Sequence, residues 1–270
     1  MKWLALLLCL LAGVATAGEL RLEGKFIQGG LVFGQAAPGS RVTFEGRAVR
    51  VAADGRFVVG FGRDFPKTAQ LSVTWPDGRR ETRTLDVAPR RYDIQRIDGL
   101  PPKKVTPPAE WLQRIRAEAA KVAAARARDT PRLDFAQPFI WPKTGRISGV
   151  YGSQRVLNGK PRRPHFGVDV AGPVGAPIVA PAAGEIVLAE PDLYFSGGTV
   201  MIDHGHGLTS VLMHLSAVDV TVGQEVAQGE PIGKLGATGR VTGPHLDWRM
   251  NWFDQRVDPQ LLVPPMPEAK

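Results

Sequence analysis

The spacing of apolar residues limits this chain to a fold built mainly from strands. In the first third of the chain, pairs such as Phe57/Val59 and Leu71/Val73 repeat with a period of two, the interval at which strand side chains return to one face. Turn sequences such as Asp54-Gly55 separate these runs, as hairpin turns do. The 31 glycines and 23 prolines favour short strands and turns over long helices. We therefore predict a mainly β fold.

Residues 18–88 contain about seven such runs, which suits a small immunoglobulin-like β-sandwich. This stretch has no histidine and no clustered carboxylates. Because residues of catalytic type are missing from it, we predict an accessory domain that binds, spaces or shields.

A connector and a second domain are predicted to follow. The prolines of residues 89–108 indicate a stiff, extended linker, and residues 109–128 carry apolar residues at helical spacing. We expect this helix to pack by one side on a domain; a partner-binding coil is the alternative. Residues 89–134 thus form a Pro-rich linker and helix. Residues 135–265, where strand patterns return, form an antiparallel β domain.

The first 17 residues have the pattern of a secretory signal peptide. Met1-Lys2 is a short basic start, residues 3–14 are nearly all apolar, and Ala15-Thr16-Ala17 fits a cleavage site. A membrane anchor is the alternative, but the apolar run is shorter than the roughly 20 residues that a spanning helix needs. Cleavage would remove Cys9, the only cysteine. The mature chain would then contain neither a disulfide nor a thiol nucleophile.

The predicted export and the charge of the chain together point to an anionic partner outside the cytoplasm. The net charge of +8 suits the cell wall or an acidic membrane surface. We expect no binding of nucleic acid, since the sequence has no recognition helix, Cys/His finger or aromatic RNA-binding motif. We also expect no stable membrane anchor. The periplasm is the expected location, with an extracellular or wall-associated location as the alternative.

All five histidines lie in the second domain, from His165 onward. His165 and Asp169 are four residues apart in a β-like segment, so their side chains share one face. A metal site is one interpretation of this pair and a His–Asp hydrogen bond in a core is the other. His204 and His206 lie in a probable turn, where we expect surface residues.

His245 and Asp247 also share a strand face, because they are two residues apart. Arg249 follows on that face and Trp248 lies on the opposite one. A solvated polar face would explain this pattern equally well. His214 ends an apolar strand, where a lone histidine is usually a core or edge residue.

Three segments in this order nevertheless resemble one family. His165-x-x-x-Asp169, then His214-Leu215-Ser216, then the glycine-rich run from Gly236 to Asp247 resemble the lysostaphin-type (LytM-like) zinc metalloendopeptidases, which cleave peptidoglycan. The resemblance covers residues 138–262 and excludes the N-terminal domain. It implies a C-terminal antiparallel β peptidase domain of the lysostaphin type.

The resemblance also implies roles for individual residues. His165 and Asp169 are expected to bind Zn²⁺, and His214 and His245 are the expected catalytic pair. The family's third ligand is a histidine, whereas this chain has Asp247, which we expect to bind the ion in its place. Two carboxylates would formally neutralise Zn²⁺ and weaken its pull on bound water, and Mn²⁺ or another divalent ion is an alternative.

His204 or His206 could replace the missing histidine ligand of the expected metal site. The loop at residues 152–164 carries Arg155, Arg162 and Arg163, and Arg163 is the candidate substrate-binding residue; a basic surface loop is the alternative. One histidine of the catalytic pair would accept a proton from water and the other would protonate the leaving amine.

The expected function is hydrolysis of peptide cross-links in peptidoglycan by a secreted zinc endopeptidase. One alternative is a catalytically degenerate member that binds the cell wall or activates a separate amidase. Another is a structural envelope protein whose working part is the N-terminal domain. The expected partners are peptidoglycan and, for regulation, an amidase or another wall protein.

Overall fold

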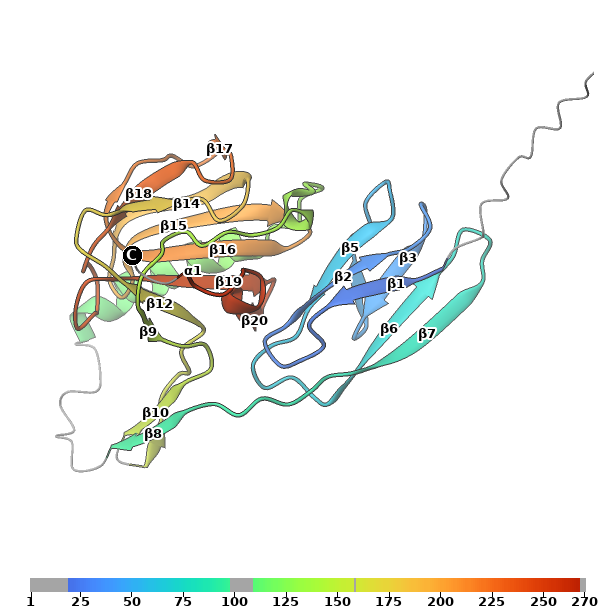
Figure 1. Cartoon of the computed structure of the whole chain (residues 1–270), viewed down its shortest axis with the longest axis horizontal. Helices are drawn as coiled ribbons and strands as arrows, with labels where there is room; N and C mark the ends of the chain where they lie inside the picture. Colours follow the sequence, from blue (N-terminus) through green and yellow to red (C-terminus); the bar gives the residue numbers. More distant parts are fainter. Residues whose placement is uncertain (1–18, 98–108, 158, 268–270) are drawn as a thin grey trace, which may run out of the picture.

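The computed structural model describes residues 19–97, 109–157 and 159–267. They form two regions built from sheets, with one helix between them in the sequence (Figure 1). The predicted signal peptide, Cys9 and the prolines of residues 98–108 lie outside the described residues. No helix in the described ranges is long and apolar enough to cross a membrane.

The N-terminal region consists of two antiparallel sheets, with the orders β1-β2-β5 and β4-β3-β6-β7. Along β6, exposed residues alternate with the buried Ala69, Leu71 and Val73, so the period of two does mark strands with one buried face. The assignment to an immunoglobulin-like sandwich stays a prediction. The strands are β1 (Arg21–Gly24), β2 (Leu31–Gln35), β3 (Arg41–Phe44), β4 (Arg47–Val49), β5 (Arg56–Gly60), β6 (Thr68–Thr74) and β7 (Arg80–Asp86).

The segment after this region differs from the predicted linker. Residues 94–97 form strand β8 (Ile94–Ile97), which pairs in parallel with β10 (Gln154–Leu157) of the C-terminal region. β10 also pairs with β11 (Lys160–Pro161). Residues 90–100 contain no proline, so their backbone N–H groups can join a ladder. The linker prediction misses this contact because it joins segments far apart in the sequence.

A helix follows where helical spacing predicts one. A short 3-10 turn, η2 (Ala109–Trp111), leads into α1 (Leu112–Arg126). Ala125 is buried, and Val122 packs beside it against strands of the C-terminal sheet. One side of the helix therefore packs on a domain, as a connector does.

The C-terminal region is a ten-stranded antiparallel sheet with the central order β17-β14-β15-β16-β19-β12-β9. β13 pairs with β18, β18 also pairs with β16, and β20 pairs with β19. Two 3-10 turns, η3 (Asp134–Ala136) and η4 (Pro259–Leu261), flank the sheet in sequence. Its strands are β9 (Ile147–Gly149), β12 (Gly167–Ala171), β13 (Pro177–Val179), β14 (Gly184–Leu193), β15 (Gly197–Gly205), β16 (Leu208–Val218), β17 (Glu225–Val226), β18 (Pro231–Leu235), β19 (His245–Trp252) and β20 (Gln255–Val257).

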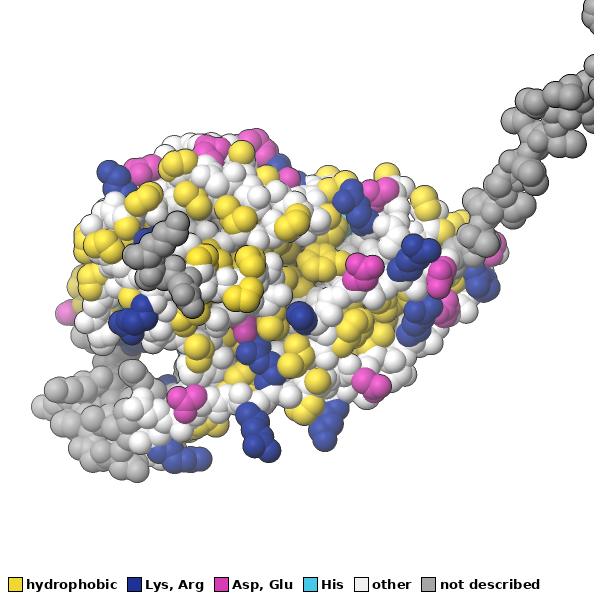
Figure 2. All heavy atoms as spheres, in the orientation of Figure 1, with side chains coloured by type: hydrophobic (Ala, Val, Ile, Leu, Met, Phe, Trp, Pro, Cys, Tyr) yellow, Lys and Arg dark blue, Asp and Glu magenta, His cyan; other side chains and the backbone are white. Residues whose placement is uncertain are grey.

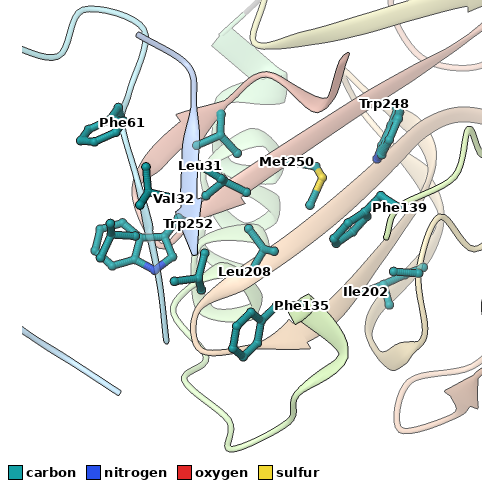
Figure 3. Packing of buried hydrophobic residues seen from close by; sticks show 14 of the residues in the cluster. Leu31, Val32, Phe61, Phe135, Phe139, Ile202, Leu208, Trp248, Met250 and Trp252 are labelled. Carbon is teal, nitrogen blue, oxygen red and sulfur yellow. The ribbon is translucent and has the colours of Figure 1, made fainter. Parts of the chain in front are cut away.

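Strand β19 has an apolar face and a polar face. Leu246, Trp248 and Met250 point into the main core, where Figure 3 shows Trp248 and Met250 with residues of β15 and β16. His245, Asp247 and Arg249 occupy alternate positions and therefore lie on the other face. The sheet thus packs a core with one face and presents polar groups on the other.

Helix α1 covers part of this polar face. Val211 and Met213 of β16 lie directly opposite Arg249 and Asp247 of β19, so these four side chains share one face. Val211 and Met213 pack with Ala125 of the helix in a second, smaller core. The helix packs on strands β14, β15 and β16, so it leaves the part of this face formed by β12 and the start of β19 to the cleft.

The two regions share the main core at the far end of β19. Trp252 is 2% exposed, and its ring centroid lies 5.7 Å from that of Phe44 in the N-terminal region. Figure 3 shows Trp252 near Phe61, Leu31 and Val32 of that region. Arg90 also forms an ion pair of 2.8 Å with the buried Asp258. The contact therefore lies at the opposite end of β19 from His245.

Candidate active site

A cleft of about 1130 Å³ lies at the open end of the polar face. His165, Asp169, His214, His245 and Asp247 all line it. The three sequence segments that carry the family resemblance therefore meet at one place. Residue types suited to metal binding and to proton transfer share this cleft.

His165, Asp169 and Asp247 form the possible metal site. Within the described ranges, they are the group of three potential ligands whose donor atoms lie within 4.8 Å of one another. His165 Nε2 is 3.0 Å from Asp169 Oδ1 and 3.4 Å from Asp247 Oδ2. One nitrogen and two carboxylates are an acceptable donor set for Zn²⁺.

The strand register brings these groups together. Asp169 of β12 lies directly opposite Asp247 of β19 in an antiparallel ladder, and opposed residues point to the same face. His165 precedes β12, and its Nδ1 lies 3.2 Å from the carbonyl oxygen of Val150. A carbonyl only accepts, so in the neutral ring Nδ1 carries the proton and Nε2 has the lone pair that a metal needs.

The surroundings of His165 Nε2 favour a cation. Both this nitrogen and Asp169 Oδ1 are buried, and although they lie 3.0 Å apart, neither makes a hydrogen bond of acceptable geometry with any described residue. Burial lowers the pKa of His165, but Asp169 and Asp247 outweigh it and raise the pKa to about 10. The carboxylates that attract a proton to Nε2 would attract a divalent ion in the same way. The residues present therefore fit a metal ion.

Asp247 has a second partner, Arg249, which lies on the same face of β19 because strand side chains alternate. Arg249 Nη2 donates to Asp247 Oδ2 at 2.6 Å, and Arg249 Nε lies 3.0 Å from Oδ1 and 3.1 Å from Oδ2. Burial raises the pKa of Asp247, but Arg249 and then His165 hold it well below its usual range. The expectation that the two carboxylates formally neutralise Zn²⁺ therefore leaves out the positive charge of Arg249.

His214 and His245 lie beside the possible metal site. Their ring centroids are 4.9 Å apart. His214 Nδ1 donates to the carbonyl oxygen of Thr238 at 2.9 Å, and His245 Nδ1 donates to that of Gly243 at 2.8 Å. In both neutral rings Nε2 is then left for proton exchange; His245 Nε2 lies 3.8 Å from Asp169 Oδ1.

His214 is held in a constrained conformation. Its φ is 67°, a left-handed value that costs energy for residues other than glycine. Burial lowers the pKa of His214, although Asp247 acts in the opposite direction. A neutral imidazole beside the possible metal site suits a proton acceptor.

The expected surface position of His204 and His206 is wrong. Both are buried, with 0% and 2% exposure. His204 Nδ1 donates to the carbonyl oxygen of Ala183 at 2.7 Å, and its Nε2 lies 2.8 Å from Ser210 Oγ. The segment before η3 covers the turn, and His206 N–H donates to the carbonyl oxygen of Thr130 at 3.0 Å. Neither histidine is in the possible metal group.

The basic loop does border the cleft. Arg162 and Arg163 line it, whereas the side chain of Arg155 is outside the described part of the structure. The cleft also includes Asp93 and Gln95 from the segment that contains β8. Sequence reasoning missed these two residues, because no local pattern predicts the parallel pairing of β8 with β10.

Comparisons with known proteins indicate the family of this chain. The model of peptidase family M23 matches residues 163–259, a range that contains all five cleft residues of the possible metal site and the histidine pair. The crystal structure of a putative peptidase M23 from Pseudomonas aeruginosa is 33% identical and has a TM-score of 0.69. That match covers 88% of this chain and 95% of the other.

Two curated relatives match shorter stretches of this chain. The peptidoglycan DD-endopeptidase ShyA of Vibrio cholerae is 41% identical over 87 residues, which are 32% of this chain and 20% of that protein. The DD-carboxypeptidase/endopeptidase Mpg of Neisseria meningitidis is 41% identical over 106 residues, which are 39% of this chain and 24% of that protein. The chain thus spans about a fifth of the length of the curated relatives that it matches. The site, the family match and the similarity along nearly the whole Pseudomonas aeruginosa chain lead to one conclusion: this chain belongs to peptidase family M23.

Proposed function

We propose that this protein is a zinc-dependent endopeptidase that hydrolyses peptide cross-links of peptidoglycan. The observation that carries the proposal is the meeting of His165, Asp169 and Asp247 with His214 and His245 in one cleft. The similarity to a peptidoglycan DD-endopeptidase of Vibrio cholerae and to a DD-carboxypeptidase/endopeptidase of Neisseria meningitidis supports this substrate class.

In this proposal His165 Nε2 and the carboxylates of Asp169 and Asp247 hold the ion. A bound zinc ion supplies Lewis acidity toward water and toward the scissile carbonyl. His214 and His245 share the proton transfers: one accepts a proton from the attacking water and the other donates a proton to the leaving amine. The hydrogen bonds from both Nδ1 atoms fix the rings so that Nε2 serves in each case.

The charge around the cleft supports an anionic wall peptide as substrate. Arg162, Arg163 and Arg240 line the cleft, and basic side chains lie along the lower edge of the molecule toward β8 and β10 (Figure 2). Arg163 is the proposed substrate-binding residue, because its guanidinium can pair with a carboxylate of the peptide.

The remaining assignments extend this proposal to the whole chain. Residues 1–17 are a signal peptide that directs export, with the periplasm as the destination. Residues 18–88 are an accessory immunoglobulin-like domain, residues 89–134 a linker and helix, and residues 135–265 the peptidase domain. A separate amidase or a regulatory wall protein is the proposed protein partner of this chain.

A second candidate function rests on the pair of Asp247 and Arg249. A guanidinium that already neutralises Asp247 is compatible with a non-catalytic module that binds the wall or activates an amidase. This candidate predicts binding of peptidoglycan without hydrolysis.

The test is digestion of purified, cross-linked peptidoglycan by the full mature chain loaded with Zn²⁺, with the muropeptides identified by mass spectrometry. We expect cross-linked dimers to fall to monomers with the native protein and to persist with His165→Ala. Binding of peptidoglycan without any change in its muropeptides, with Zn²⁺ or Mn²⁺, would favour the second candidate.

A further inference from the structure

Arg249 binds the carboxylate that takes the place of a third histidine ligand. Its guanidinium contacts both oxygens of Asp247 at 2.6 to 3.1 Å. Asp247 is 2% exposed, whereas the side chain of Arg249 retains 28% of its exposure. Charge-assisted contacts to a buried carboxylate are among the stronger polar interactions in proteins. The pair is therefore a fixed part of the cleft.

The pair changes the net charge that the site offers to a metal. A neutral His165, Asp169 and Asp247 carry a charge of −2, and Arg249 reduces it to −1. A site with two neutral histidines and one aspartate also carries −1. Asp247 and Arg249 together therefore have the charge of one neutral histidine.

We propose that Arg249 is a positioning residue that makes Asp247 act as a neutral ligand, so that the site keeps the charge of a His/Asp/His set. The inference rests on the proposed metal site. Arg249 contacts Oδ2 of Asp247 through both Nη2 and Nε, and Oδ1 through Nε alone. Oδ2 also lies 3.4 Å from His165 Nε2, so the carboxylate bridges the guanidinium and the proposed metal position.

The opposite interpretation is that Arg249 takes the place of the ion. The two interpretations differ for Asp247→His, which restores the family's third ligand. If Arg249 only takes the place of an ion that the site no longer binds, the histidine introduced by Asp247→His improves metal binding. If Arg249 balances Asp247, the same substitution leaves the guanidinium unpaired beside the ion, and metal binding weakens.

The experiment is a double-substitution cycle in the full mature chain. The affinity for Zn²⁺ is measured at pH 7.5 by competition with a fluorescent chelator. The native site has a charge of −1. Asp247→His changes it to 0, Arg249→Met changes it to −2, and the double variant returns it to −1. Two controls are included: Arg249→Lys keeps the positive charge but not the planar guanidinium, and Arg240→Met removes a different arginine that lines the cleft.

We expect Arg249→Met to bind Zn²⁺ at least about ten-fold more tightly than the native protein, because a unit charge near a partly buried ion has an effect of at least that size. Asp247→His should bind about ten-fold more weakly, and the double variant should regain the native affinity to within a few-fold. Arg249→Lys and Arg240→Met should stay within about three-fold. Circular dichroism spectra with and without Zn²⁺ check that each variant is folded.

Tighter binding by Asp247→His than by the native protein would overturn the proposal, as would weaker binding by a folded Arg249→Met. Native protein that binds no Zn²⁺ would also overturn it. Because the readout is metal affinity, failure of this inference can be distinguished from failure of the proposed function. If only the proposed function fails, the affinities still follow the expected order while peptidoglycan stays intact.

Discussion

Asp169 and Asp247 lie directly opposite each other across the antiparallel strands β12 and β19. Like charges in such a pair destabilise a sheet, so the pairing requires nearby cations. Arg249 supplies one at Asp247, and His165 Nε2 lies within 3.4 Å of both carboxylates. The strand register thus creates a position where a divalent ion is favoured, and the two other histidines of the cleft lie beside it.

Replacing either histidine of the proposed catalytic pair should remove activity while the metal stays bound. His214→Gln and His245→Gln should each lower the rate of cross-link hydrolysis by about 10²- to 10⁴-fold, the usual contribution of a general acid or base. The zinc content per chain should stay at the native value, because the proposed ligands of the ion are His165, Asp169 and Asp247. Both quantities are measured on the same preparation; loss of zinc from either variant would place that histidine among the ligands.

Thr238 should position His214. Its hydroxyl accepts from the N–H of Gly198 at 2.9 Å and donates to the carbonyl oxygen of Leu215 at 2.8 Å, while its own carbonyl receives the proton of His214 Nδ1. Thr238→Val keeps the shape but removes both hydroxyl bonds, so we expect kcat to fall about ten-fold without loss of zinc. Thr238→Ser keeps the hydroxyl and is the matched control. Equal rates for the two variants would argue against this role.

Buried His204 should make the protein sensitive to acid. Burial lowers the pKa of His204 to about 4 in the folded protein, against about 6.5 in the unfolded chain. The unfolded state therefore binds the proton more readily, so the stabilisation is complete above pH 6.5 and is lost as the pH falls toward 4. The loss from this one group is about 3 kcal/mol.

The measurement for His204 is the free energy of unfolding in urea at pH 7.5 and pH 4.5. His204→Gln should lose less stability between these two pH values than the native protein, by about 2 kcal/mol. An equal loss in both proteins would show that His204 does not titrate as expected.

Trp252 should stabilise the contact between the N-terminal and C-terminal regions. Its side chain is almost fully buried, and it packs edge-on against Phe44 of the N-terminal region. Trp252→Ala should lower the free energy of unfolding by about 3 to 5 kcal/mol, as for other buried aromatic residues. Val222 is 62% exposed, and Val222→Ala should change stability by less than about 0.5 kcal/mol. Thermal unfolding followed by calorimetry compares the two variants.

Arg163 should contribute to binding of substrate without taking part in the chemistry. Arg163→Gln should raise KM several-fold for soluble cross-linked muropeptides and leave kcat nearly unchanged. The reason is that the substitution weakens binding of the substrate and of the transition state equally. The difference from the native protein should shrink at high salt, because exposed charges are screened. A fall in kcat alone would assign Arg163 to the reaction instead.

Local patterns were enough to predict most elements of this fold. Alternation with a period of two marks strands such as β6, because one face of a sheet is buried and the other exposed. Helical spacing likewise predicts α1, whose buried side is provided by Val122 and Ala125. The parallel pair of β8 and β10 is different: it depends on two backbone segments that meet only after the chain has folded.

The sequence was enough to predict that His165, Asp169, His214 and His245 lie together, because their order, spacing and intervening glycines resemble those of one family. It also placed Asp247 and Arg249 on one strand face, since strand side chains alternate. Only the folded chain shows that the two form an ion pair and that Asp247 lies opposite Asp169. It also shows that His204 and His206 are buried: His204 lies within β15, and the chain before η3 covers the turn that contains His206. Partners and burial depend on which distant segments pack together, and no local pattern carries that information.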